Sequence, residues 1–77
     1  MLYENVDKVI VYLNDGDTFT FTEILSVSEH TSERGALALE INYLADNETK
    51  ALSKTIFVLT NDNVVHYTII YKKNIWP

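Results

Sequence analysis

The sequence predicts a small, mainly β, antiparallel protein, and three observations support this fold class. Two β-type runs, 9–13 and 18–22, flank an Asn-Asp-Gly-Asp turn, which is typical of a β-hairpin. Apolar side chains recur at every second position over 37–43 and 65–71, as they do in half-buried strands. The single proline is the last residue, Pro77, so no strand is interrupted by a residue without a backbone N–H.

The chain is expected to form a single small β domain over residues 1–77, folded as a meander of about five strands. The meander is barrel-like or a curled sheet, and one short helical turn is expected near 31–34. The strands are expected near residues 6–13, 17–28, 36–44, 52–60 and 64–72.

The register of the first hairpin has two readings. A two-residue turn at Asp15 and Gly16 pairs Leu13 with Thr18, whereas a three-residue loop with a G1 bulge pairs Leu13 with Asp17. A slip of one residue exchanges the two faces of each strand. The bulged register is preferred because it separates apolar from threonine side chains more cleanly. Its apolar face consists of Val9, Val11, Leu13, Phe19 and Phe21, and Tyr12 lies on the threonine face.

The stretch 22–34 has two readings, the continuation of a long strand or a helix. Period-two alternation through Leu25 and Val27 favours the strand, although Glu23 interrupts it. A run of mediocre helix formers, 26–32, also argues against a helix.

The pattern of apolar side chains differs between the later strands, and this difference predicts how each strand is buried. Residues 36–44 place Leu37, Leu39, Ile41 and Tyr43 on one face. The run 56–59 is apolar on both faces, which predicts a central strand.

Composition narrows the range of functions. The 77 residues include no cysteine, which excludes disulfides, cysteine-based zinc sites and thiol catalysis. A domain of this size buries only about 60% of its unfolded surface, so a partner subunit would add needed stability. Residues 1–7 have no apolar core typical of a signal peptide, and no apolar run approaches the roughly 20 residues that span a bilayer. The expected location is the cytoplasm.

The net charge of −5 is unevenly distributed. Residues 1–49 carry ten acids against Lys8 and Arg34, whereas residues 50–77 carry a charge of +3. Such asymmetry favours an acidic face that binds a basic protein, and it disfavours binding to nucleic acid. The acidic residues expected in loops, and therefore proposed as partner contacts, are Asp15, Asp17, Glu29, Glu33, Asp46 and Glu48.

No catalytic or metal-binding set can be assembled from the sequence. His66 lies within an expected strand, and His30 follows Glu29 in an expected loop, with no second ligand pair at a suitable spacing. The two glycines, at positions 16 and 35, cannot form a phosphate-binding loop or a nucleophile elbow. We therefore expect no enzyme activity, no cofactor and no metal.

Several aromatic residues are candidates for an interface, because tyrosine and tryptophan are favoured there. The apolar pair Ile75 and Trp76 at the end of the chain must pack either on the domain's own core or on another chain. The candidate interface aromatics are Tyr12, Tyr67, Tyr71 and Trp76.

Two functions remain, from different classes. The first is a non-catalytic protein-binding module, an inhibitor or adaptor that occupies a basic surface of a larger partner. In size, acidity and lack of a catalytic set, the chain resembles the compact acidic proteins that phages and other mobile elements use to block host machinery. The second is a self-associating structural subunit, most simply a homodimer. An OB-like nucleic-acid binder is a distant alternative that the charge disfavours.

Overall fold

The computed structural model describes residues 1–31, 35–46, 48–60 and 63–73, and these residues form seven strands and no helix. The prediction of a mainly antiparallel β protein is confirmed. The strands are β1 (Leu2–Tyr3), β2 (Val6–Leu13), β3 (Thr18–Phe21), β4 (Ile24–Thr31), β5 (Leu37–Asp46), β6 (Ala51–Val58) and β7 (Val64–Tyr71).

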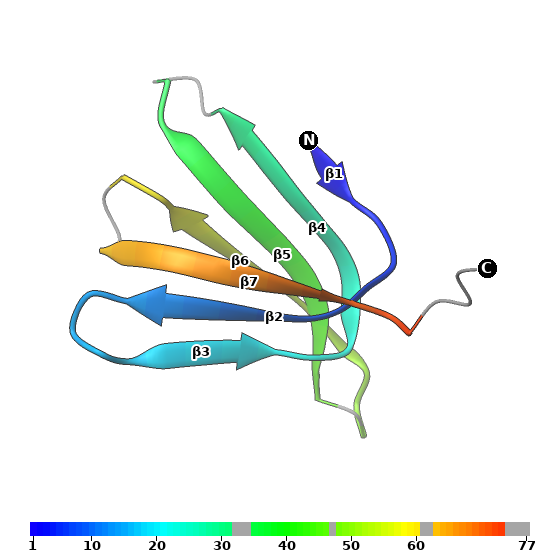
Figure 1. Ribbon diagram of the computed structural model, residues 1–77. Helices are drawn as coiled ribbons and strands as arrows, with labels where there is room; N and C mark the ends of the chain where they lie inside the picture. The colour runs from blue at the N-terminus through cyan, green and yellow to red at the C-terminus, as the bar shows by residue number, and fades with distance from the viewer. Residues whose placement is uncertain (32–34, 47, 61–62, 74–77) are drawn as a thin grey trace.

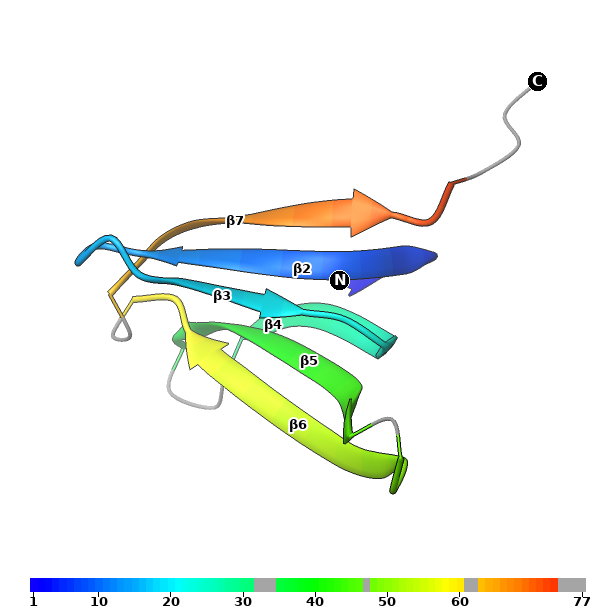
Figure 2. The same ribbon diagram turned by 90° about the horizontal axis from the view of Figure 1, so that it is seen from below.

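The strands form two antiparallel sheets that face each other, and they do not close into a barrel (Figures 1 and 2). The larger sheet has the order β1-β4-β5-β6, and the smaller has the order β3-β2-β7. The core lies between them and takes residues from both. It consists of Val6, Val9, Val11, Val27, Leu39, Ile41 and Phe57.

The first hairpin adopts the bulged register. Val9 pairs with Phe21 and Val11 with Phe19, and the Leu13 N–H donates to the Asp17 carbonyl oxygen at 2.9 Å. Gly16 has a φ of 94°, a left-handed conformation that glycine adopts at no steric cost.

The expected strand over 17–28 is wrong as a single strand. It is divided into β3 and β4, which belong to different sheets. The break falls at Glu23, whose φ is 53°. In a continuous strand, Glu23 would share the inward-facing period of Phe21 and Val27, and an unpaired buried carboxylate is very costly. A left-handed turn at this position keeps Glu23 exposed and sends the chain to the other sheet.

Two further expectations need correction. The strand 52–60, expected at the centre of a sheet, is β6 at an edge, and its Ile56 is 47% exposed while Phe57 is buried. His30 lies in β4 rather than in a loop, because β4 continues to Thr31. Of the helical turn expected near 31–34, only Thr31 is described, as a strand residue, and 32–34 lie outside the described residues.

Aromatic rings join the two sheets on the side of β3 and β6. The Phe21 ring lies 5.1 Å from the Tyr43 ring and 5.9 Å from the Phe57 ring, measured between centroids. Phe19, which was expected to be buried, is 47% exposed, although its ring lies 6.2 Å from that of Phe57. Figure 2 shows that β6 lies nearest the smaller sheet at its C-terminal end and diverges from it toward its N-terminal end.

This arrangement predicts unequal costs for two neighbouring phenylalanines. Phe21→Ala should lower the free energy of unfolding by about 3 kcal/mol, because it removes a ring packed between the sheets. Phe19→Ala should cost about 1 kcal/mol, the ordinary value for a point mutant, because nearly half of its side chain is already in water. Urea denaturation of both variants measures the difference, and equal costs would contradict the described packing.

Candidate functional site

A groove lies at the end of the sandwich where the chain crosses between the sheets. Its volume is about 390 Å³. A smaller depression of about 170 Å³ shares Val6, Ile24, Leu25 and Lys72 with it. We call the two together the end groove. It is lined by Leu2, Tyr3, Glu4, Asn5, Val6, Asp7, Glu23, Ile24, Leu25, Ser26, Leu44 and Lys72.

Two left-handed residues build the end groove. Asn5, with a φ of 57°, lies where the chain leaves β1 for β2, and Glu23 lies where it leaves β3 for β4. Both residues therefore sit at crossings between the sheets. Their carbonyl oxygens are tied to other strands, since Asn5 accepts from the Lys72 N–H at 2.6 Å and Glu23 accepts from the Leu44 N–H at 3.1 Å. These bonds hold the groove walls in place.

The end groove combines apolar side chains with acidic ones. Leu2 is 60% exposed and Leu25 is 55% exposed, over a floor that includes the buried Val6. The acids Glu4, Asp7 and Glu23 are all exposed around them, with one base, Lys72. An apolar centre with a charged rim is the ordinary composition of a protein-binding surface.

The acidic residues predicted from the loops do not form one surface. Asp15 and Asp17 lie in the β2–β3 loop, and Asp46 and Glu48 lie at the β5–β6 connection, at the other end of the molecule (Figure 1). Glu33 lies outside the described residues.

Asp15 and Asp46 also stabilise their own turns. The Asp15 Oδ1 accepts the Asp17 N–H at 2.9 Å, and the Asp46 Oδ1 accepts the Glu48 N–H at 2.8 Å. The hydrogen bond from the Glu48 N–H, followed by that from Thr49, lowers the pKa of the Asp46 carboxyl below its usual value.

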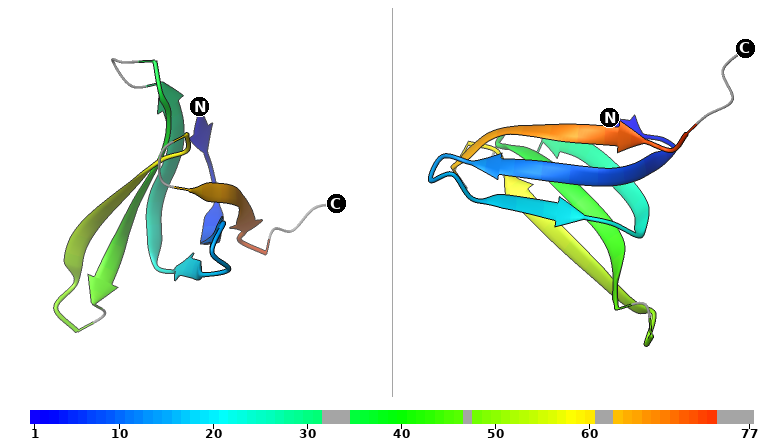
Figure 3. Two further views of the ribbon diagram at one scale, coloured as in Figure 1. Left: turned by 90° about the vertical axis from the view of Figure 1, so that its left-hand side faces the viewer. Right: turned by 60° about the horizontal axis from the view of Figure 1, so that its bottom comes forward.

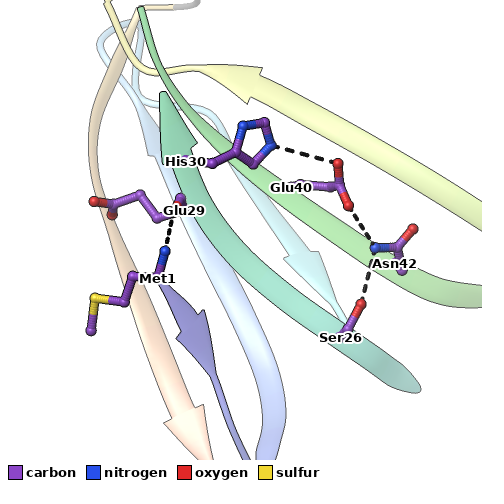
Figure 4. A network of polar contacts seen from close by, with 6 residues as sticks. All are labelled: Met1, Ser26, Glu29, His30, Glu40 and Asn42. Carbon is purple, nitrogen blue, oxygen red and sulfur yellow. Dashed lines mark hydrogen bonds and ion pairs between the residues drawn. The ribbon is translucent and has the colours of Figure 1, made fainter. Parts of the chain in front are cut away.

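Glu29, expected in a loop, lies in β4 and takes part in a polar cluster between the sheets. Its carboxylate accepts hydrogen bonds from the hydroxyls of Tyr67 in β7 and Tyr3 in β1, and the two hydroxyls lie 3.1 Å apart. The backbone of Glu29 is bonded to Met1, whose amino group donates to the Glu29 carbonyl oxygen at 2.6 Å (Figure 4). Glu29 therefore joins β1, β4 and β7 and is engaged inside the protein.

Burial, followed by the hydrogen bond to Glu29, raises the pKa of the Tyr67 hydroxyl far above its ordinary value of 10.0. This cluster could not be predicted from the sequence, because its members are separated by 26 and 38 positions.

The other predicted aromatics are dispersed. The Tyr12 ring stacks on the His66 ring at 4.2 Å on the outer face of the smaller sheet, where the preferred register placed it. Tyr71 is 54% exposed at the end of β7. Trp76 lies outside the described residues, as does its neighbour Ile75.

A second polar network crosses the outer face of the larger sheet (Figure 4). The Asn42 amide donates to the Ser26 hydroxyl at 3.0 Å and to the Glu40 carboxylate at 3.1 Å. The His30 imidazole lies 3.6 Å from the same carboxylate. The hydrogen bond from Asn42 is the main cause of the lowered pKa of Glu40, to which the charge of Lys54 also contributes. These contacts pair the polar side chains of this face with one another.

Within the part of the chain that the structure describes, no group of three or more acids and histidines is placed to hold a metal ion. The same residues include no helix that is long and apolar enough to cross a membrane. No protein family, curated protein or solved structure matches the chain.

The hydrogen bonds among Tyr67, Glu29 and Tyr3 predict how the free energy of unfolding changes at alkaline pH. Since the folded protein raises the pKa of Tyr67, the unfolded chain loses this proton first, so the stabilisation is complete below about pH 10 and declines above it. Tyr67→Phe should lower the free energy of unfolding by about 1–2 kcal/mol at neutral pH and should make the alkaline decline shallower. Urea denaturation between about pH 7 and pH 11 tests this.

The matched control is Tyr71→Phe, on the same strand and 54% exposed. It should leave both the neutral stability and the alkaline decline unchanged. If the two variants have the same pH profile, Tyr67 does not carry the predicted stabilisation.

Proposed function

We propose that the chain is a non-catalytic protein-binding module of the cytoplasm, an inhibitor or adaptor that occupies a basic surface of a larger protein. The observation that carries this proposal is the end groove, in which exposed leucines are surrounded by carboxylates. The loop acids remain a second candidate contact, and the experiment below compares the two.

The exposed leucines favour a protein as the ligand rather than a small molecule. Small-molecule sites usually enclose most of the ligand. Here Leu2 and Leu25 are each more than half exposed, so they project outward and can enter a pocket on a partner. Apolar anchors of this kind supply most of the binding energy once a polar rim excludes water around them.

The charge of the rim favours a basic partner. Glu4, Asp7 and Glu23 outnumber Lys72, and the chain as a whole carries −5. Opposite charges on a partner would accelerate association and fix its orientation, and salt would weaken the effect.

The groove also suits binding because its backbone is fixed in advance. Both left-handed residues, Asn5 and Glu23, accept backbone hydrogen bonds from distant parts of the chain, Lys72 and Leu44 respectively. A surface that is already ordered loses less conformational entropy when it binds. Left-handed backbone at a glutamate costs roughly 1–2 kcal/mol, and such local strain is concentrated at functional sites.

The test compares two charge-reversed variants. The groove variant carries Glu4→Lys, Asp7→Lys and Glu23→Lys, and the loop variant carries Asp15→Lys and Asp17→Lys. Each is immobilised beside the wild type, proteins are captured from an extract of the source organism, and affinities for the purified partner are measured by calorimetry. We expect the groove variant to bind at least tenfold more weakly, about 1.4 kcal/mol, and the loop variant to bind as the wild type does.

Melting temperatures and a further variant show whether a loss of binding reflects unfolding or the loss of a contact. Leu25→Ser keeps every charge but removes one anchor, and it should also weaken binding without a large change in melting temperature, since Leu25 is 55% exposed. If the loop variant alone loses affinity, the acidic loops are the contact surface. If no variant loses affinity, the proposed electrostatic binding is wrong.

A further inference from the structure

The two sheets end in four edge strands, and they are not equally open to another strand. β1 has two residues and β3 has four, which are short edges. β7 has eight, but its pairing with β2 shifts register between Val6 and Lys8 and again between Tyr12 and Leu13. β6 has eight residues and pairs with β5 without a shift from Leu52 to Val58. A long, regular edge of this kind is the one best suited to strand addition.

The register shows which peptide groups of β6 face outward. The Leu59 N–H donates to the Leu37 carbonyl oxygen, so the pairs Leu39–Phe57, Ile41–Thr55 and Tyr43–Ser53 are hydrogen-bonded. The intervening residues of β6 direct their N–H and C=O groups away from β5. Among the described strands, none lies on that side of β6. Leu52, Lys54 and Ile56 therefore present a regular row of backbone donors and acceptors.

The side chains of the same residues favour association at this edge, because two of them are apolar and exposed to solvent. Leu52 is 77% exposed and Ile56 is 47% exposed. Natural edge strands usually carry several charges, a proline or a bulge to prevent pairing. In the stretch 51–58, Lys54 is the only charge, and there is no proline.

We propose that a second copy of the chain covers this edge, with the β6 strands of the two copies pairing antiparallel about a twofold axis at Thr55. In this register, Lys54 forms a hydrogen-bonded pair with Ile56 of the second copy, and Thr55 faces its own counterpart in a non-hydrogen-bonded pair. The two four-stranded sheets then become one continuous sheet.

Charge selects this register over its neighbour. Shifting the axis to Lys54 places the two lysines directly opposite each other, and like charges in such a pair are destabilising. With the axis at Thr55, each Lys54 faces Ile56, whose partner on the far side is Glu40 of the second copy. Glu40 of the second copy then lies two strand spacings from Lys54, about 10 Å, and the two opposite charges lie on the same face of the joined sheet.

The oligomeric state tests the proposal directly. Light scattering with size-exclusion chromatography of the complete chain should give a dimer mass at micromolar concentration, and this mass should persist at high salt.

Lys54→Pro removes an N–H that points away from β5, so it should leave the folded monomer intact and abolish the dimer. Ile56→Lys should raise the dissociation constant of the dimer at least tenfold, because it places two lysines opposite each other in one cross-strand pair. Val65→Lys, at a 60% exposed position on β7, should not.

The register is tested by cross-linking, since the chain has no cysteine of its own. Thr55→Cys should form an intermolecular disulfide on mild oxidation, because residues at the axis in a non-hydrogen-bonded pair have side chains close enough to bridge. Ser53→Cys, on the same strand face and equally half-buried, should not. A monomer mass, or cross-linking at Ser53 instead of Thr55, would overturn the proposal. Neither result bears on the end groove, whose variants should leave the dimer intact.

Discussion

The left-handed turn at Glu23 is the constraint on which the architecture depends. Without it, the alternation of Phe19, Phe21, Leu25 and Val27 would continue as one strand in one sheet. Because of the turn, Phe19 and Phe21 lie in one sheet and Leu25 and Val27 lie in the other, and the two sheets face each other. The core between the sheets, with Val9 and Val11 on one side and Val27 on the other, exists because of this crossing.

The two open sides of the sandwich are joined by different chemistry. On the side of β3 and β6, aromatic rings meet, and the Phe21 ring lies edge to face with the Phe57 ring. On the side of β1 and β7, two tyrosine hydroxyls converge on the carboxylate of Glu29, an arrangement that is directional and sensitive to protonation. The aromatic side is also the one where β6, an edge strand of the larger sheet, diverges from the smaller sheet (Figure 3).

Local rules account for the parts of the fold that could be predicted. The Asn-Asp-Gly loop and period-two alternation identified the first hairpin, its preferred register and the strand 6–13, because turn chemistry and side-chain polarity act over a few residues. Only Glu23 signals the division of 17–28 in the sequence, because it interrupts the period-two alternation, and an interruption does not show that the chain crosses to a second sheet. The position of β6 at an edge could not be derived from its own residues, since 56–59 are apolar and burial depends on where the neighbouring strands lie.

The same limit applies to the candidate site. The end groove brings together Leu2, Glu4, Glu23, Leu25 and Lys72, residues from three places in the chain, and none of them stands out in the sequence. Loop acids were the natural candidates from the sequence because loops carry function more often than strands do. Two of them, Asp15 and Asp46, are engaged in forming their own turns, a role that the sequence also allowed.

The two proposed surfaces are compatible because they differ in position and in charge. The end groove is bordered by β1, at one edge of the larger sheet, whereas β6 forms the opposite edge. Acids surround the groove, and the only charge on β6 is positive, so a basic partner drawn to the groove is not drawn to the dimer edge. Pairing through β6 would therefore leave both grooves of a dimer accessible. Against a partner with two basic sites at a suitable spacing, the second contact would be intramolecular, and avidity would exceed the affinity of one groove without any new interaction.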